Sequence, residues 1–259
     1  MSRLGGKVAI VTGGGRGIGA GIVRCFLNEG ATVVVAQRSD VPPELERDVT
    51  FVRTDLSDAE SIKQLADAVV RAHGGVDVLV NNAGVMFERH VRDMTVAEWD
   101  QILDVNLKAP FLLTQAVLAP MEERGRGSII NIGSIEGLAA NPGHTAYCAT
   151  KSGVHGMTRA MAVDLGTSGI RVNAIAPGWI ETDLVKEYVS QIADQESFAQ
   201  QLRELHPAGR SGQPVDIGRT AAFLASDDAA FITGQVIVVD GGRLMQISLP
   251  GMLRQLTSD

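Results

Sequence analysis

A tyrosine and a lysine four residues apart are the first residues of this chain with types and spacing suited to chemistry. Tyr147 and Lys151 lie in a helical pattern, in which this spacing places both side chains on one face, about one turn apart. A phenol with a pKa of about 10 is a poor acid–base group at neutral pH. A neighbouring ammonium stabilises the phenolate and lowers that pKa, so the pair predicts a proton-transfer device. An exposed tyrosine beside a solvated lysine is the simpler alternative.

A glycine-rich segment, TGGGRGIG at residues 12–19, follows an apolar run and precedes a helical pattern. Gly13, Gly17 and Gly19 carry the spacing GxxxGxG. Glycine permits a tight turn and the close approach of a pyrophosphate, and a helix N-terminus offers free N–H groups to phosphates. The position between a strand and a helix favours a dinucleotide site, with a turn that binds no ligand as the alternative.

Six motifs, in their order and spacing, make nearly the whole chain resemble the classical short-chain dehydrogenase/reductase family. They are the glycine loop at 12–19, Asn81-Asn82-Ala83-Gly84, Asn106, Ser134, Tyr147-Cys148-Ala149-Thr150-Lys151, and Pro177-Gly178. The resemblance implies one doubly wound α/β Rossmann domain with a seven-stranded parallel sheet. It also implies an oxidoreductase that transfers a hydride between a nicotinamide cofactor and a ketone or secondary alcohol.

The same resemblance assigns four catalytic residues. Tyr147 gives a proton to the carbonyl oxygen in reduction and takes one from the alcohol in oxidation. Lys151 lowers the tyrosine pKa and bonds the nicotinamide ribose. Ser134, at the family's spacing from the tyrosine, fixes and polarises the substrate oxygen, and Asn106 helps to hold a water linked to the lysine.

The cofactor-binding residues that the resemblance implies come mostly from the ends of the predicted strands. Asp55 matches the family aspartate that meets the adenine amino group, although it could instead cap the helix that begins near Asp58. Ile180 and Thr182 match the positions that bond the nicotinamide carboxamide. The full set is Gly13, Gly15, Arg16, Gly17, Ile18, Gly19, Gln37, Arg38, Asp55, Leu56, Asn82, Ala83, Gly84, Tyr147, Lys151, Pro177, Gly178, Ile180 and Thr182.

The end of the second predicted strand bears on the choice of cofactor. An acid there would bond the ribose hydroxyls and repel a 2′-phosphate, but residues 36–39 read Ala-Gln-Arg-Ser. Arg38 can pair bidentately with a 2′-phosphate, and Arg16 points to the same pocket in family members that prefer NADP. We therefore expect NADP(H) to be preferred over NAD(H). The alternative is two solvated arginines, with Gln37 bonded to a ribose hydroxyl.

Substrate contacts are expected from three segments: the residues after Ser134, the loop after the fourth strand, and a flap of one or two amphipathic helices at 183–206. The flap is acidic overall, which disfavours a highly anionic substrate such as an acyl-carrier-protein thioester. A small or medium ketone, secondary alcohol, polyol or steroid-like alcohol fits best. For His144, binding a substrate oxygen and capping a loop are equally open. The candidates are Ser134, Glu136, Leu138, Asn141, His144, Met86, Trp179 and Leu184.

The elements that must position these residues alternate between strand and helix. Apolar runs typical of buried parallel strands occupy 8–11, 32–36, 49–52, 76–80, 128–132, 171–175 and 236–239. Helical periodicity occupies 18–29, 58–72, 96–123, 146–166 and 214–225, and Pro110 is expected to bend the longest of these helices. This alternation, without a linker, predicts one catalytic domain over residues 1–259.

Composition excludes several other classes of protein. Of 259 residues, 45% are hydrophobic and 20% charged, which suits a globular chain with a sizeable core. A net charge of −7 argues against a nucleic-acid partner. With no run of 18 apolar residues and no signal-peptide pattern, we expect a cytoplasmic protein without a membrane partner. Two cysteines and five histidines show neither a disulfide framework nor metal-ligand spacing, so no metal is expected.

Two helical segments carry more apolar and small residues than one buried face needs, namely 96–123 and 146–166. Family members pair these helices with symmetry mates, so a homotetramer, or else a homodimer, is expected. The tail at 243–259 is too apolar to be solvated, and packing on its own subunit or across an interface are both open. Two functional alternatives also stay open: a catalytically silent dinucleotide-sensing module, and a 3-oxoacyl thioester reductase.

Overall fold

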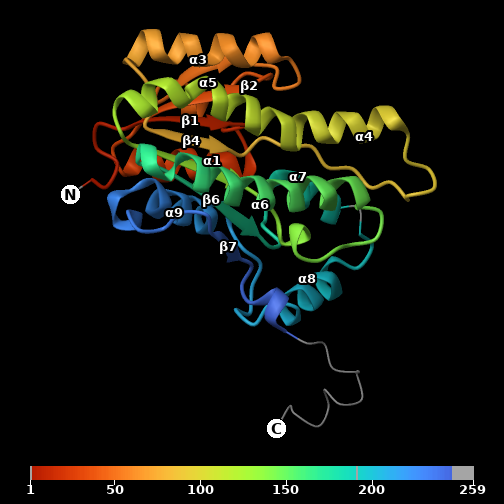
Figure 1. Cartoon of the computed structure of the whole chain (residues 1–259). Coiled ribbons are helices and arrows are strands. Elements are labelled where there is room, and N and C mark those ends of the chain that lie inside the picture. The colour runs from red at the N-terminus through yellow and green to blue at the C-terminus, as the bar shows by residue number, and fades with distance from the viewer. Residues whose placement is uncertain (1, 191, 247–259) are drawn as a thin grey trace.

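A seven-stranded sheet forms the centre of the molecule in the computed structural model, which describes residues 2–190 and 192–246 (Figure 1). The strand order is β3-β2-β1-β4-β5-β6-β7, and every pairing is parallel. The order reverses between β1 and β4, which is where doubly wound sheets bind ligands at the carboxyl ends of their strands. The strands are β1 (Val8–Thr12), β2 (Thr32–Gln37), β3 (Thr50–Arg53), β4 (Val78–Asn81), β5 (Gly127–Ile132), β6 (Ile170–Pro177) and β7 (Val236–Val239).

Helices cover both faces of this sheet, because successive side chains of a strand point to opposite sides. In β1, Ala9 and Val11 pack with α1 (Gly17–Asn28) and α9 (Pro214–Ala225). Ile10, between them, packs on the other face with α3 (Ala59–His73) and α5 (Ala109–Glu123). The remaining α-helices of the described chain are α2 (Pro43–Glu46), α4 (Val96–Leu103), α6 (Thr145–Leu165), α7 (Asp183–Ser190) and α8 (Gln195–Glu204).

The long helix expected over 96–123 is divided into α4 and α5 by a π-helical turn, Asp104–Lys108. Pro110 follows this turn. Proline donates no backbone hydrogen bond and its ring crowds the carbonyl one turn earlier, and a widened turn accommodates both effects. The whole stretch Val96–Glu123 is long and apolar enough to cross a membrane by length and composition. In this fold, however, Leu113, Val117 and Met121 are fully buried in the core on the α3 side of the sheet, as in a core helix.

The predicted elements agree with the structure, and their ends differ by at most two residues. The fold class is therefore confirmed, and the flap at 183–206 consists of two helices, α7 and α8. Sequence patterns missed α2, a single turn that begins at Pro43. At the other end, the Asp240 carboxylate accepts hydrogen bonds from the backbone of Gly242 and Leu244. The expectation for the tail concerns mostly residues 247–259, which lie outside the described residues.

Candidate active site

The glycine loop joins β1 to α1 at the carboxyl edge of the sheet. Gly13 and Gly17 have φ angles of +63° and +52°, which other residues rarely adopt. A Cβ on Gly19 would lie 2.1 Å from the carbonyl oxygen of Gly13, so only glycine fits there. Arg16, the residue before α1, makes no side-chain capping bond, which leaves the first N–H groups of α1 without that partner. The loop therefore fits a pyrophosphate.

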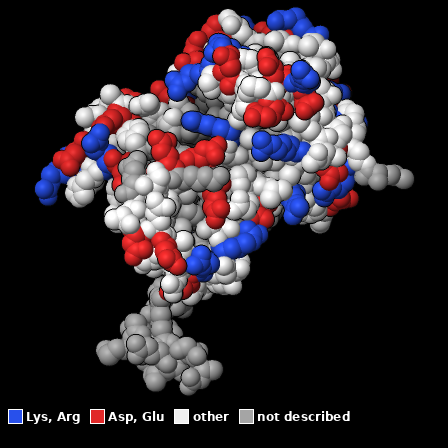
Figure 2. Space-filling view, turned by 180° about the vertical axis from the view of Figure 1, so that it is seen from behind, with Lys and Arg blue, Asp and Glu red and all other residues white. Residues whose placement is uncertain are grey.

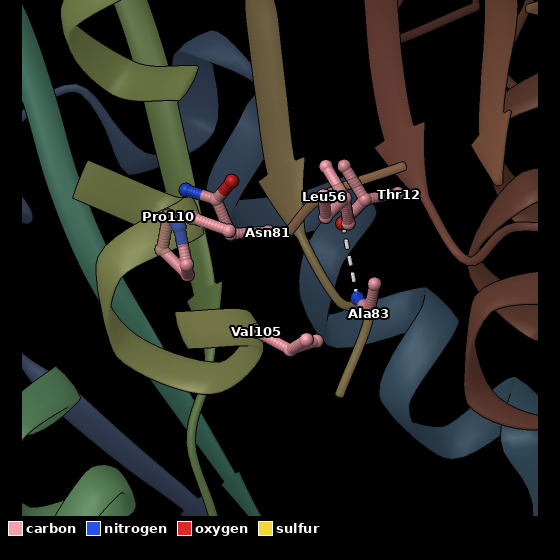
Figure 3. Close-up of a pocket in the computed structure, with 7 residues that line it drawn as sticks. Thr12, Leu56, Asn81, Ala83, Val105 and Pro110 are labelled. Atoms are coloured by element: carbon pink, nitrogen blue, oxygen red, sulfur yellow. Dashed lines mark hydrogen bonds between the residues drawn. The ribbon is translucent and has the colours of Figure 1, made fainter. Parts of the chain in front are cut away.

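The end of β4 is tied to the glycine loop through Thr12. Its hydroxyl accepts hydrogen bonds from the backbone N–H groups of Asn82, at 2.9 Å, and Ala83, at 3.0 Å. The Asn82 side chain returns a bond of 2.8 Å to the Thr12 carbonyl oxygen. Figure 3 shows the small pocket beside this junction, which Ser134 and Tyr147 do not line. Its lining residues are Thr12, Leu56, Asn81, Ala83, Val105, Ala109 and Pro110.

Gln37 connects the end of β2 to the glycine loop, a contact that the sequence did not reveal. Its side-chain oxygen accepts a hydrogen bond of 2.8 Å from the Gly15 N–H group. A Cβ on Gly15 would lie 2.5 Å from the Gln37 side-chain nitrogen, so the two residues are in close contact. Arg16 and Arg38 are exposed at the same end of the sheet. Arg53, which we did not predict, donates a hydrogen bond to the Arg38 carbonyl oxygen.

Asp55 lies after β3 and holds a turn rather than a helix end. Its carboxylate accepts bonds from the Ser57 backbone, at 2.9 Å, and from the Ser57 hydroxyl, at 2.7 Å. These bonds hold the pKa of Asp55 below its ordinary value. The helix cap belongs to Asp58, which accepts from the Glu60 N–H group. The capping alternative for Asp55 was therefore wrong, and its contact with adenine stays a prediction.

Ser134, Tyr147 and Lys151 lie together where β5 meets α6. The Ser134 hydroxyl oxygen accepts a 3.0 Å bond from the Glu136 N–H group, and the Ser134 and Tyr147 side chains are hydrogen-bonded. The Lys151 ammonium donates a 2.8 Å bond to the Ile132 carbonyl oxygen and lies 5.5 Å from the centre of the Tyr147 ring. The fold thus brings together the Tyr147–Lys151 pair, which helical spacing predicted, and Ser134, which the family resemblance added.

Burial controls the protonation of this group. It raises the pKa of Tyr147 to about 12, with nearby Glu136 and Cys148 adding to the effect and the Ser134 hydrogen bond opposing it. It lowers the pKa of Lys151 to about 8. We expected the ammonium to lower the pKa of Tyr147, but desolvation is the larger effect. Tyr147 is therefore a phenol at neutral pH.

Asn106 joins the group from the π turn and is 2% exposed. Its side-chain nitrogen lies 3.4 Å from the Thr150 hydroxyl, which in turn donates a 2.8 Å bond to the Tyr147 carbonyl oxygen. A Cβ on Gly84 would lie 3.3 Å from the Asn106 side-chain oxygen and 3.8 Å from the Lys151 nitrogen. Thr150, which we did not single out, thus links Asn106 to α6.

The turn after β6 closes the site from the other side. Gly178 packs against Asp240, because a Cβ there would lie 2.7 Å from the Asp240 Cβ. Ile180 is 5% exposed and packs with the core. A Cβ on Gly17 would lie 3.1 Å from the methyl group of Thr182. The structure therefore brings Thr182 to the glycine loop, about 165 residues away in sequence.

Residues predicted to contact substrate fall into separate groups. Glu136, Asn141 and His144 form one hydrogen-bonded cluster. Trp179 packs edge-on against Phe198 of α8, with ring centres 5.9 Å apart, and its buried indole nitrogen has no partner among the described residues. Met86 and Leu138 are exposed. The structure does not describe the side chain of Leu184.

His155 is a buried neighbour of the site that the sequence analysis missed. It lies one turn beyond Lys151 on α6 and is 2% exposed. Its ring fills the space beside two glycines that flank the Ser134 turn, since a Cβ on Gly133 or Gly137 would lie 2.3 or 2.5 Å from it. Burial, with Lys151 and Arg159 adding, lowers the pKa of His155. Its spacing of four from the lysine was the available signal.

Comparison with known proteins agrees with this geometry. A family model described as enoyl-(acyl carrier protein) reductase matches residues 13–243. A 3-alpha-(or 20-beta)-hydroxysteroid dehydrogenase of Mycobacterium bovis is 44% identical over 248 residues, which cover 93% of this chain and 90% of that protein. The chain belongs to the short-chain dehydrogenase/reductase family.

Other members of this reductase family are similar over most of their length. A 3-oxoacyl-(acyl-carrier-protein) reductase of Thermotoga maritima is 38% identical and covers 93% of this chain and 98% of its own. The ligand-free aldohexose dehydrogenase of Thermoplasma acidophilum superposes with a TM-score of 0.90 at 32% identity, over 96% of this chain and 99% of that one. The short-chain dehydrogenase/reductase described here is thus an oxidoreductase with the fold of its family.

Proposed function

We propose that this enzyme is NAD(P)-dependent and interconverts a ketone and a secondary alcohol. The observation that carries the proposal is the contact of Ser134, Tyr147 and Lys151 at the same sheet edge as the glycine loop. A proton donor, a hydroxyl that can bind an oxygen, and a phosphate cradle are the parts such a reaction needs. A module that only senses a dinucleotide would not need the first two.

The chain's own residues account for binding of the cofactor. The N-terminus of α1 and the glycines of its loop would hold the pyrophosphate, and Asn82 shapes that loop through the Thr12 carbonyl oxygen. Lys151 would bond the nicotinamide ribose, while Ile180 and Thr182 would hold the carboxamide. When bound, the nicotinamide gives or takes the hydride.

Proton transfer falls to Tyr147. Because its pKa is raised to about 12, it carries its proton at neutral pH and can give it to a carbonyl oxygen in the reductive direction. Ser134 accepts a bond from the Glu136 N–H group, so its one hydroxyl proton remains to be donated, and substrate would take it in place of the present bond to Tyr147. The charge on Lys151 stabilises the phenolate left behind, since opposite charges close together favour the ionised form.

NADP(H) is our proposed preference. In support, Arg16 and Arg38 are exposed at the end of β2, and the expected position of an acid there holds Gln37. The Arg53 side chain, which also pairs with Asp40, fixes the backbone at Arg38. A guanidinium at that place suits a 2′-phosphate.

A neutral ketone or secondary alcohol of small or medium size is the proposed substrate. Glu136 and Glu88 lie beside His144 near the reacting group, and a thioester carried by an acidic protein or coenzyme would meet repulsion there. The alternative is a 3-oxoacyl thioester reductase, because one relative is named as a 3-oxoacyl-(acyl-carrier-protein) reductase. Figure 2 shows acidic and basic side chains interspersed over the face it presents.

A symmetric assembly, a homotetramer or homodimer, is also proposed. A groove between α4, the π turn, the start of α5 and α6 contains the apolar residues Leu103, Leu107, Phe111 and Met157, with Asp100, Asp104 and Lys108 also lining it. Phe111 is 47% exposed there. Such a surface commonly marks an interface. The unpaired thiols Cys25 and Cys148 support a reducing compartment such as the cytoplasm.

A panel of neutral ketones, secondary alcohols, polyols and a 3-oxoacyl thioester, each tested with NADPH and NADH at 340 nm, tests the function. We expect turnover of at least one neutral substrate, with a rate roughly 10²–10⁴-fold lower in Tyr147→Phe. Binding of NADPH without any turnover would instead favour a sensing module. A clear preference for the thioester would favour the acyl reductase.

A further inference from the structure

Three side chains converge on one carboxylate beside the proposed catalytic residues. Asn141 donates a 3.0 Å hydrogen bond to one oxygen of Glu136. The His144 ring nitrogen Nδ1 lies 2.7 Å from the other oxygen, and the Cys148 thiol donates to that same oxygen at 3.5 Å. The Glu136 side chain is only 12% exposed. This is a closely enclosed group rather than a surface charge.

The partners of Glu136 surround Tyr147. His144 is the residue before α6 begins, and its ring stands edge-on to the Tyr147 ring with centres 6.2 Å apart. Cys148 is the next residue on the helix. Through its backbone N–H group, Glu136 also donates to the Ser134 hydroxyl oxygen at 3.0 Å. One residue thus contacts Ser134 with its backbone and the start of α6 with its side chain.

We propose that Glu136 is a positioning residue that holds Ser134 and Tyr147 in register. The proposal rests on the proposed function, because it assigns to Glu136 the geometry of that same site. Further along α6, Ser152 donates a 3.1 Å bond to the Gly137 carbonyl oxygen and Lys151 bonds the Ile132 carbonyl oxygen, which ties the turn to the helix body. The Glu136 side chain adds the ties to the residues on either side of Tyr147, namely His144 and Cys148. Errors of about 1 Å at a reacting group cost on the order of 100-fold in rate.

The charge of Glu136 acts on the same pair. A carboxylate near a phenol disfavours the phenolate, and Glu136 adds to the raised pKa of Tyr147. The titratable groups that face Glu136 are His144, Tyr147 and Cys148 from α6 and its start, with Glu88 of the loop after β4 behind His144 at 3.7 Å. Glu136 therefore contributes both a tie and a negative charge, and two variants separate these effects.

Glu136→Asp keeps the charge but shortens the side chain, and Glu136→Gln keeps the length but removes the charge. On the substrate identified by the panel, we expect Glu136→Asp to lower kcat on the order of 10- to 100-fold with little change in NADPH affinity. Glu136→Gln should also shift the pH profile of alcohol oxidation to lower pH. The matched control is Glu122→Gln, which removes an exposed carboxylate near the end of α5 and should leave kcat and the profile within about twofold.

A spectroscopic readout does not depend on turnover. The chain has two tyrosines, so Tyr188→Phe leaves Tyr147 as its one phenol. In that background, ultraviolet titration of phenolate, with circular dichroism to check folding, should show ionisation at lower pH in Glu136→Gln than in the parent. Folded Glu136→Asp with wild-type kcat, or Glu136→Gln with unchanged kcat and phenolate titration, overturns the proposal. If neither Glu136 variant folds, His144→Gln removes the shortest contact of the Glu136 carboxylate. An unaltered kcat in folded His144→Gln would also overturn the proposal. An inactive wild type would instead contradict the proposed function alone.

Discussion

Asn106 forms two hydrogen bonds with the backbone of Val85. Its side-chain oxygen accepts from the Val85 N–H group at 2.8 Å, and its side-chain nitrogen donates to the Val85 carbonyl oxygen at 2.8 Å. Val85 follows directly on Gly84 of the cofactor motif, and Asn106 lies in the π turn. The Asn106 side chain thus satisfies both backbone groups of Val85 in the loop after β4, as a neighbouring strand would. Asn106 fixes that loop against α6, where its side-chain nitrogen lies 3.4 Å from the Thr150 hydroxyl.

Removing this side chain should damage both stability and turnover. In Asn106→Ala the Val85 N–H and carbonyl groups lose their partners, and each unpaired, partly buried group costs about 1–3 kcal/mol. We expect a lower melting temperature and a fall in kcat on the order of tenfold, because the cofactor loop loses its anchor. Gln101→Ala, at an exposed position on α4, is the control. A folded Asn106→Ala enzyme with wild-type kcat and melting temperature would contradict this role.

The two directions of the reaction should respond differently to pH. Reduction needs the Tyr147 phenol and oxidation needs its phenolate, and a pKa of about 12 keeps the phenol in excess. Between pH 6 and 8, below the loss of charge on Lys151, oxidation should rise about tenfold per pH unit while reduction stays level. Initial rates at saturating cofactor measure both directions. In Tyr147→Phe both should fall by roughly 10²–10⁴-fold, and a variant that kept a tenth of wild-type kcat would exclude this assignment.

Lys151→Met should abolish turnover yet stabilise the fold near neutral pH. Burial lowers the pKa of Lys151 from 10.5 to about 8, which corresponds to about 3 kcal/mol spent on keeping the ammonium inside. The unfolded chain binds the proton more tightly, so the penalty is complete below pH 8, shrinks between 8 and 10.5, and vanishes above. Loss of the bond to the Ile132 carbonyl offsets part of the gain. Melting temperatures from pH 6 to 11 test this, and a variant less stable than wild type at pH 7 would refute it.

The fold and the catalytic residues were predictable because both depend on local patterns. The strand β1 is buried on both faces of the sheet, as a covered parallel strand must be, and it was visible as a continuous apolar run. Tyr147 and Lys151 share a face because a helix turns every 3.6 residues. Ser134 needed the resemblance to a family, since nothing local places it beside Tyr147. Periodicity alone predicts that Tyr147 and Lys151 lie together. The order and spacing of the family motifs were needed to add Ser134 to the site.

What the sequence did not reveal depends on side-chain direction. The hydrogen bond from the Gly15 N–H group to the Gln37 side chain joins the glycine loop to the end of β2. No spacing rule predicts such a bond. Glu136 was a candidate for substrate contact, and for His144 substrate binding and loop capping were both open, but the two side chains bond each other. The π turn follows from one shifted hydrogen bond near Pro110, which propensity does not encode. Each feature is decided by tertiary packing.

Cofactor preference can be tested at Arg38. Replacing this exposed guanidinium in Arg38→Asp puts a repelling charge where a 2′-phosphate would lie, so Kd for NADPH should rise on the order of 10- to 100-fold while that for NADH changes little. Fluorescence titration of the reduced cofactors measures both. Arg47→Asp, an equal charge change at an exposed position after α2, should leave the ratio unaltered. A wild-type enzyme with higher kcat/KM for NADH would contradict the preference itself.

Assembly can be tested on the apolar groove beside the π turn. Phe111 is 47% exposed there, close to Leu107, which packs so tightly on α6 that a Cβ on Gly153 would lie 2.9 Å from it. If the groove is covered by a second copy, Phe111→Lys replaces a buried apolar contact with a charged side chain at that interface, and the loss is repeated by symmetry. Light scattering at micromolar concentration should then show a smaller assembly than wild type.

The control for that experiment is Lys63→Glu, which changes the charge of an exposed residue on α3, away from the groove. It should leave the assembly unaltered, whereas Phe111→Lys should keep the far-ultraviolet circular dichroism of wild type while its mass falls. A wild-type mass near 27.4 kDa, that of one chain, would refute the assembly outright. An assembled Phe111→Lys protein would place the interface on another surface. Because Phe111 lies on the same helical stretch as Asn106, a smaller assembly with altered kcat would tie association to the geometry of the active site.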